Sequence, residues 1–335
     1  MRPFLVQLAA FLLLQSALLG VLLNYYDVAE ETNYLAATVD KHSRLCVRPA
    51  PRVILVGGSN VAFGFESDRM ESALGRPVVN MGLAAGLGVE FMLAEIEPAL
   101  RPGDIIVLSL EYDHFARGPA AGRYSALGFD PNVLRQVLIF RPEGCLDLGW
   151  THVRKIVLDR GLSILGEIAR RGFMFGIGAR EAKTSELQSA RKGFNPWGDL
   201  IGHRQEPART TAELVNRLPL VADVRKFPNP AALEVIRDFV DRTRRTGARV
   251  AFTFTPKPTG TILRDGELAW RLAEALRQIP GVTLLDAPQD HAYPPEQFFD
   301  SANHLTAEGA AQRTSKVIAS LQRFMTNNPE RRKSE

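Results

Sequence analysis

A serine, an aspartate and a histidine stand where they could form a nucleophilic triad. Ser59 follows Gly57 and Gly58 at the end of an apolar run, where glycines allow a sharp turn that exposes a hydroxyl at the top of a sheet. Asp300 and His304 are four positions apart on a predicted loop, so the carboxylate can fix the imidazole tautomer while the other ring nitrogen faces the serine. This pattern indicates acyl transfer through a serine. The alternatives are that Ser59 and His304 cap helices and that Asp300 structures a turn.

A polar cluster, Glu111, Asp113 and His114, directly follows the third predicted strand. Open α/β sheets bind ligands beyond the carboxyl ends of their strands, so we expect these side chains to contact substrate. Carboxylates and imidazole could hold a metal, but no ligand spacing such as His-Glu-x-x-His occurs, and a hydrogen-bonding role is favoured. The turn after the first strand also lacks the dinucleotide and P-loop glycine patterns. We expect neither a metal nor an organic cofactor.

The elements that must position these residues follow from hydrophobic patterning. Continuous apolar runs, typical of strands buried on both faces, lie at residues 53–56, 78–79, 105–110, 250–255 and 282–285. Amphipathic stretches between them predict helices at residues 89–100, 231–246, 267–279 and 306–324. Right-handed crossovers between such strands give an α/β fold, an open three-layer α/β/α sandwich with a parallel sheet.

The connection between the third and fourth predicted strands is too long for a simple loop. We interpret residues 116–228 as an insertion with structure of its own, including a helix at residues 151–171. It is either a solvated cap or a substrate lid that carries Trp197 to the site. The polar residues 326–335 are expected to form a disordered tail.

The order of these blocks resembles the GDSL/SGNH hydrolase superfamily. The similarity covers residues 52–115 and 249–321 and leaves the insertion unmatched. The resemblance implies a flavodoxin-like fold with Ser59 as nucleophile, His304 as base and Asp300 as the partner of the base.

The resemblance also implies an oxyanion hole. The stretch Asn80-Met-Gly82-Leu-Ala-Ala-Gly86 is similar to the glycine block of the family, so the backbone N–H groups of Ser59, Gly86 and Gly82 are the candidate donors, Gly86 being the better glycine. Asn60, beside the nucleophile, is expected to contact substrate.

The chain also departs from the family pattern. Gly58 replaces the usual aspartate before the serine, and Glu111-Tyr-Asp113-His stands where the family has Gly-x-Asn-Asp. An ionised Asp113 near a developing oxyanion would oppose it, and a missing oxyanion donor typically costs ~10²-fold or more in rate. Asp300 and His304 are separated by three residues, whereas two is the commonest family spacing.

Residues 4–23 form an uncharged apolar run that can cross a membrane. A helix of this length spans ~30 Å at ~1.5 Å per residue, the thickness of a bilayer core. The alternative is a cleaved signal peptide, whose apolar region is normally only ~7 to 15 residues long. Arg2 precedes the run and acidic residues follow it, which predicts a cytoplasmic N-terminus and a periplasmic or extracellular body.

These boundaries give the predicted domain organisation. It consists of a membrane anchor over residues 1–24, a linker over residues 25–50, an SGNH-like α/β domain over residues 51–325 and the tail.

Composition limits the function classes further. The 335 residues are 45% hydrophobic and 23% charged, which excludes a disordered or disulfide-scaffold protein. The net charge of +4 is too small for a dedicated nucleic-acid binder, so no nucleic-acid partner is expected. Cys46 and Cys145 could pair in an oxidising compartment or remain separate buried thiols.

Two functions follow as expectations. The first is a single-pass, membrane-anchored serine esterase or O-acyltransferase, for which the resemblance implies acylated, in particular acetylated, cell-envelope carbohydrate as substrate. The second is a binding or assembly protein for envelope polysaccharide that keeps the fold without turnover.

Overall fold

A five-stranded parallel sheet organises the described part of the chain in this computed structural model. That part comprises residues 34–116, 190–225 and 227–327, together with helical stretches between residues 3 and 15. The strands are β1 (Val53–Gly57), β2 (Val78–Asn80), β3 (Ile105–Ser109), β4 (Arg249–Phe252) and β6 (Val282–Leu284). Their order is β2-β1-β3-β4-β6, and every neighbouring pair is parallel. The predicted α/β class and parallel sheet are confirmed.

Helices and short connecting elements surround this sheet. The α-helices are α2 (Ala37–Val47), α3 (Ser59–Phe63), α4 (Ser67–Leu74), α5 (Val89–Ala94), α9 (Ala212–Arg217), α10 (Pro230–Arg245), α11 (Thr259–Arg277) and α12 (Ala307–Thr326). The 3₁₀ turns are η1 (Ala85–Leu87), η2 (Glu97–Ala99), η3 (Tyr112–Phe115), η5 (Arg191–Gly193), η6 (Pro288–His291) and η7 (Pro295–Gln297). A small parallel pair joins β5 (Lys257–Pro258) to β7 (Ala292–Tyr293).

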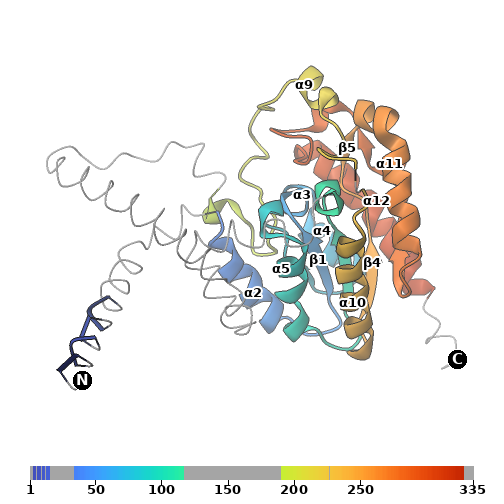
Figure 1. The fold of residues 1–335 in the computed structure, drawn as a ribbon. Helices are drawn as coiled ribbons and strands as arrows, with labels where there is room; N and C mark the ends of the chain where they lie inside the picture. The colour runs from blue at the N-terminus through green and yellow to red at the C-terminus, as the bar shows by residue number, and fades with distance from the viewer. Residues whose placement is uncertain are drawn as a thin grey trace, which may run out of the picture.

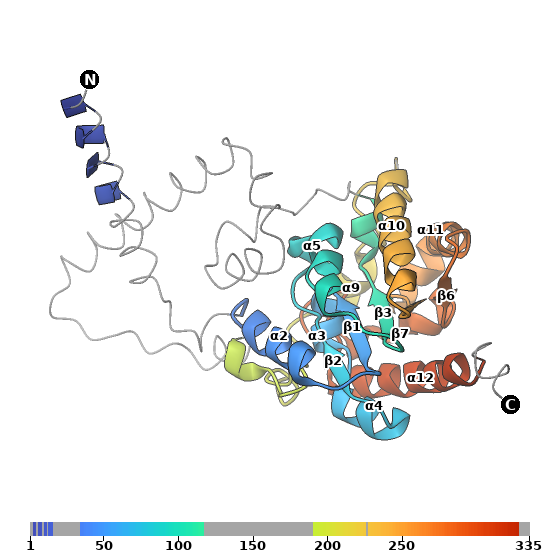
Figure 2. The same ribbon diagram turned by 90° about the horizontal axis from the view of Figure 1, so that it is seen from below.

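The sheet is covered on both faces because its strand residues alternate between two apolar clusters. Ile54 and Ile106 face the cluster that includes α2, α5, α10 and α11, whereas Leu55 and Val107 face the cluster that includes α4 and α12. Figure 2 shows α5 and α10 on one side of β1 and β3 and α4 and α12 on the other, while Figure 1 shows α9 near the end of α11. This arrangement is that of a three-layer sandwich, with the carboxyl ends of the strands gathered at one edge.

The structure differs from the predicted organisation before β1. Residues 37–47 of the predicted linker form α2, whose Ala37 and Leu45 are buried in the main core. The predicted linker over residues 25–50 is therefore wrong for this stretch. Lys41, His42 and Arg44 give it a polar appearance, yet all three side chains are buried. Lys41 and Arg44 donate to backbone oxygens of β2, and His42 lies beside Glu95.

Several predicted features fall outside the described residues. They are the second half of the run at 4–23, the insertion helix at 151–171, Cys145 and residues 328–335 of the tail. In the described ranges, no helix combines the length and the apolar character needed to cross a membrane. Cys46 is exposed on α2 rather than buried.

Candidate active site

The turn after β1 presents Ser59 at the carboxyl edge of the sheet. Gly57 ends the strand, and a Cβ there would collide with the backbone oxygen of Ser109 on the neighbouring β3. Gly58 leads into α3, whose first residue is Ser59. The close approach of two backbones explains why a glycine precedes this turn. The hydroxyl therefore stands at the top of the sheet, as the sequence predicts.

The three residues of the predicted triad meet in hydrogen-bonding order. The Ser59 hydroxyl donates to His304 Nε2 at 2.7 Å, and His304 Nδ1–H donates to Asp300 Oδ1 at 2.5 Å. The His304 ring stacks on Phe63 of α3, with 3.9 Å between centroids and 7° between planes. The imidazole is thus oriented both by a carboxylate and by an aromatic face.

The protonation states suit this order. Burial acts to raise the pKa of Asp300, but the hydrogen bond with His304 and the charges of neighbouring groups, Arg209 among them, together hold that pKa below its usual range. An ionised Asp300 keeps the proton of the ring on Nδ1 and leaves Nε2 as an acceptor for the serine proton.

A short β-bridge and a second histidine hold the loop that carries His304. Phe298 bridges antiparallel to Leu305, and the Phe299 N–H donates to His304 O at 2.8 Å. His203, from the predicted insertion, donates through Nε2 to Leu305 O at 3.0 Å. Burial lowers the pKa of His203 to about 4, so it supports the loop as a neutral ring.

The glycine block lies beside α3, but its two candidate donors differ. The Gly82 N–H donates to Asn80 Oδ1 at 2.9 Å, and a Cβ at Gly82 would lie 2.7 Å from Ala62 N. Gly82 therefore packs the loop against α3 and its amide is already engaged, which counts against the prediction that it is an oxyanion donor. Gly86 lies in η1, the turn whose first residue Ala85 approaches Gly58. The roles of Gly86 and Ser59 as oxyanion donors stay predictions.

Glu111 occupies the space beneath the nucleophile turn. Its carboxylate accepts the Gly58 N–H at 3.3 Å and the Asn60 N–H at 3.4 Å, the amides on either side of Ser59. A Cβ on Gly58 would collide with both carboxylate oxygens. The Glu111 carboxylate thus fills the place that a side chain at position 58 would take.

The other two members of the predicted cluster are held differently. His114 donates through Nε2 to Ala85 O at 2.9 Å, and its Nδ1 lies 3.3 Å from Glu111 Oε2. Asp113 Oδ1 accepts the Ala222 N–H at 3.1 Å. The carboxylate nearest the Ser59 turn is therefore Glu111, not the Asp113 that the sequence suggested as an obstacle to an oxyanion.

Asn60 does not face substrate. Its side chain is fully buried; Nδ2 donates to Ser109 O at 2.9 Å, while Oδ1 accepts from the Ser109 hydroxyl and from the Arg313 guanidinium. The prediction of a substrate contact is wrong for this residue, because the first turn of α3 directs it down between β1 and β3. It ties the Ser59 turn to the sheet.

Trp197 lies away from the triad, at the edge of the sheet formed by β2. Its carbonyl accepts the Asn80 N–H at 2.9 Å, and its ring contacts the Arg44 guanidinium of α2 at 5.1 Å. The lid interpretation of Trp197 has no support from this position.

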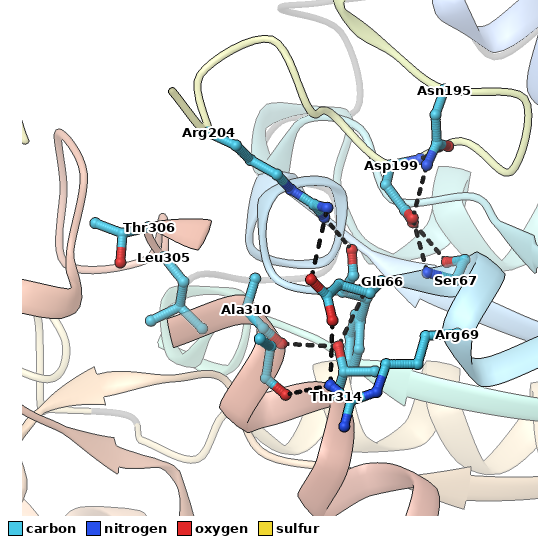
Figure 3. A network of polar contacts seen from close by, with 12 residues as sticks. Glu66, Ser67, Arg69, Asn195, Asp199, Arg204, Leu305, Thr306, Ala310 and Thr314 are labelled. Atoms are coloured by element: carbon cyan, nitrogen blue, oxygen red, sulfur yellow. Dashed lines mark hydrogen bonds and ion pairs between the residues drawn. The ribbon is translucent and has the colours of Figure 1, made fainter. Parts of the chain in front are cut away.

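A buried carboxylate, Asp199, fastens this part of the insertion to the sandwich. It accepts hydrogen bonds from the Ser67 N–H and hydroxyl and from the side-chain amides of Asn80 and Asn195. Figure 3 shows Asp199 facing Ser67 and Asn195, with Arg204 extending to Glu66 beside it. Residues 195–204 are thereby fixed next to α3 and the His304 loop.

Two residues near the site have no signal in the motifs discussed above. The Tyr34 hydroxyl donates to Leu83 O at 2.6 Å, and burial together with the charges of Glu111 and Asp300 raises its pKa. Lys257 Nζ donates to Asn303 Oδ1 at 2.8 Å, directly before His304 in the chain. Lys257 follows β4, so the rule that ligands bind at the carboxyl ends of strands could have singled it out.

The described residues contain no group of three or more His, Cys, Asp or Glu side chains placed to hold a metal. In comparisons with known proteins, the chain matches no protein-family model and no curated protein sequence.

Proposed function

We propose that this protein is a serine esterase or O-acyltransferase of the SGNH type with a flavodoxin-like fold. The observation that carries the proposal is the hydrogen-bonded chain from Ser59 through His304 to Asp300. Residues that lie far apart in the sequence meet in an order that makes an alcohol nucleophilic. The block order along the chain and the strand order of the sheet support the same proposal.

The proposed reaction runs in two acyl transfers. Ser59 Oγ attacks the carbonyl carbon of an ester while His304 Nε2 takes the hydroxyl proton, and the carbonyl oxygen becomes an oxyanion near the N–H groups of Ser59 and Gly86. Collapse of this intermediate breaks the bond to the alcohol, which leaves with the proton from His304. Water or a sugar hydroxyl then attacks the acyl-serine, and the same proton transfers run in reverse to free Ser59.

We further propose that the substrate is an acetyl or other acyl ester of cell-envelope carbohydrate. Residues 4–23 would anchor the protein in the inner or plasma membrane, with the catalytic domain on the periplasmic or extracellular side. This part of the proposal depends on the sequence pattern and on the family resemblance.

Hydrolysis of 4-nitrophenyl acetate by the full chain tests the enzymatic proposal. We expect Ser59→Ala and His304→Ala to reduce turnover to the buffer blank, and Ser72→Ala, an exposed serine on α4, to leave it unchanged. Equal turnover by the native protein and Ser59→Ala would contradict the proposal. Mass spectrometry of the products formed with an added sugar acceptor distinguishes transfer, which gives an acetylated sugar, from hydrolysis, which gives acetate.

The Glu111 carboxylate favours a second candidate, a binding protein for envelope polysaccharide that has lost turnover. A negative charge at the nucleophile turn opposes an oxyanion there, and the amide of the family pattern is missing. This candidate predicts saccharide binding that is unchanged in Ser59→Ala and His304→Ala, without ester hydrolysis by the native protein.

A further inference from the structure

Lys257 brings a buried positive charge to the edge of the site. It starts β5, just beyond the carboxyl end of β4, and pairs with Ala292 of β7. Only 4% of the residue is exposed. Its ammonium is held by Asn303, the neighbour of His304, so the lysine and the catalytic base are positioned by the same loop.

The hydrogen-bonding capacity of this ammonium is not used up. A lysine ammonium has three N–H donors, yet in the described part of the chain Asn303 Oδ1 is the one acceptor it contacts. The Tyr112 ring, 5.9 Å from Nζ, adds a weak cation–π contact. Buried donors without acceptors are costly, so the remaining N–H groups are suited to an oxygen atom of a bound substrate.

Lys41 provides an internal comparison. It is buried to a similar extent, but its ammonium donates to two backbone oxygens, those of Asn80 and Gly198, and lies 4.6 Å from the Phe194 ring. Lys41 therefore has a structural role that accounts for its donors, whereas Lys257 has donors left over at the site.

The charges around Lys257 keep it cationic at neutral pH. Burial lowers the pKa of Lys257 to about 8, and the opposing effect of Asp113 and Glu111 prevents a larger fall. On the segment after β3, the titratable groups near Lys257 are these two carboxylates and Tyr112, whose ring lies 5.9 Å from Nζ. The loop before α12 contributes Asn303.

We propose that Lys257 is a substrate-contacting residue whose ammonium binds a negatively charged oxygen in the site. This inference rests on the proposed serine chemistry. The oxygen is either the ester carbonyl oxygen as it gains charge in the tetrahedral intermediate or a carboxylate carried by the substrate. Lys257 donates a hydrogen bond and transfers no proton. In the first case it supplies the positive charge that offsets Glu111 where the family pattern has a neutral amide.

Two matched esters distinguish these sources. The probes are 4-acetoxybenzoate, which carries a carboxylate, and its neutral methyl ester, assayed with the native full chain, Lys257→Met and Lys316→Met. Methionine has a similar length and suits a buried position, and Lys316 is an exposed lysine on α12 that serves as the control. Thermal unfolding of each variant checks that the fold is kept.

We expect Lys257→Met to lower activity while Lys316→Met does not. A fall in kcat of about 10²-fold on both esters assigns the ammonium to the oxyanion. A rise in KM of about tenfold or more that is confined to the anionic ester assigns it to a substrate carboxylate. In either case the advantage of the native protein over Lys257→Met, in kcat or in KM, declines as pH rises through about 8, where the ammonium loses its proton. Lys257→Met itself shows no such pH dependence.

Kinetics of Lys257→Met equal to those of the native protein on both esters, at every pH, would overturn the role of Lys257 alone. Absence of hydrolysis by the native protein would instead overturn the proposed serine chemistry and this inference with it.

Discussion

His304 Nε2 lies 2.7 Å from the Ser59 hydroxyl, although 245 positions separate the two residues in the chain. The topology of the sheet accounts for this proximity. Ser59 follows β1, an interior strand between β2 and β3, and the loop before α12 returns across the carboxyl edge of the sheet to the same point. The parallel strands all end at one edge of the sheet, and this brings a serine and a histidine that are far apart in the sequence into contact.

The tautomer of His304 should control activity. In Asp300→Asn the new amide can donate to Nδ1, which favours the ring with its proton on Nε2 and removes the acceptor for the serine proton. We expect ester hydrolysis to fall by about 10³- to 10⁴-fold with little change in KM. Asp238→Asn, an exposed aspartate on α10, is the control. Retained activity in Asp300→Asn would show that His304 does not depend on this carboxylate.

Gly58 should tolerate no side chain while Glu111 is present. In Gly58→Ala the Cβ would collide with the Glu111 carboxylate and lie 2.7 Å from Ala85 N, so we expect a loss of about 1 to 3 kcal/mol in the free energy of unfolding. Chemical denaturation measures this loss.

A matched glycine provides the control for this prediction. Gly266, inside α11, has nothing within 4 Å of an added Cβ, and Gly266→Ala should stabilise by about 0.5 to 1 kcal/mol. Adding Glu111→Ala to Gly58→Ala should recover part of the loss, since the contact with Ala85 remains. Equal stability of Gly58→Ala and Gly266→Ala would contradict the packing described for Glu111.

Much of the fold could be predicted from the sequence because buried parallel strands leave continuous apolar runs. Helices were harder. The predicted helix at 267–279 begins at Thr259 in the structure, because Gly260 and Gly266 weaken the local helical pattern while burial of Ile262 extends the helix. The sequence does not predict helix α2, since Lys41 and Arg44 find their hydrogen-bond partners far away in the sequence, as with Arg44 and Val78 O.

The site divides in the same way. Ser59, Asp300 and His304 could be predicted because a triad needs particular residue types next to a strand end and a helix start. The sequence could not predict the direction of each polar group. The Asn60 side chain points into the core, and the Gly82 N–H donates to Asn80 Oδ1. It also could not predict that the Glu111 carboxylate fills the space beside Gly58, because this contact depends on the register of β1 with β3.

Asp199 should be essential for stability. Asp199→Ala leaves the Ser67 hydroxyl and two side-chain amides, from Asn80 and Asn195, without their buried acceptor, so we expect a loss of about 3 kcal/mol or more in the free energy of unfolding. Asp68→Ala, an exposed aspartate on α4, should change stability by less than about 0.5 kcal/mol. Similar denaturation midpoints for the two variants would argue against the network in Figure 3.

Glu95 should make stability depend on pH. Burial raises the pKa of Glu95 from 4.5 to about 8, an effect that Lys41 reduces, and its carboxyl lies 3.5 Å from His42 Nε2. A raised folded-state pKa means that the stabilising contribution is complete below pH 4.5 and is lost as pH rises through about 8.

Unfolding free energies measured over that range test the sign. Native protein should lose stability relative to Glu95→Gln as pH increases, because glutamine stays neutral in the core. Glu274→Gln, on the exposed face of α11, should follow the native protein at every pH. A constant difference between native protein and Glu95→Gln would contradict the prediction.

Covalent labelling tests whether Ser59 is an activated nucleophile. The full chain is incubated with a fluorophosphonate probe, and intact-mass and peptide mass spectrometry locate the adduct. We expect one adduct per chain on Ser59, formed far more slowly in His304→Ala and absent in Ser59→Ala. An unlabelled native protein, or equal labelling of native protein and Ser59→Ala, would contradict this expectation.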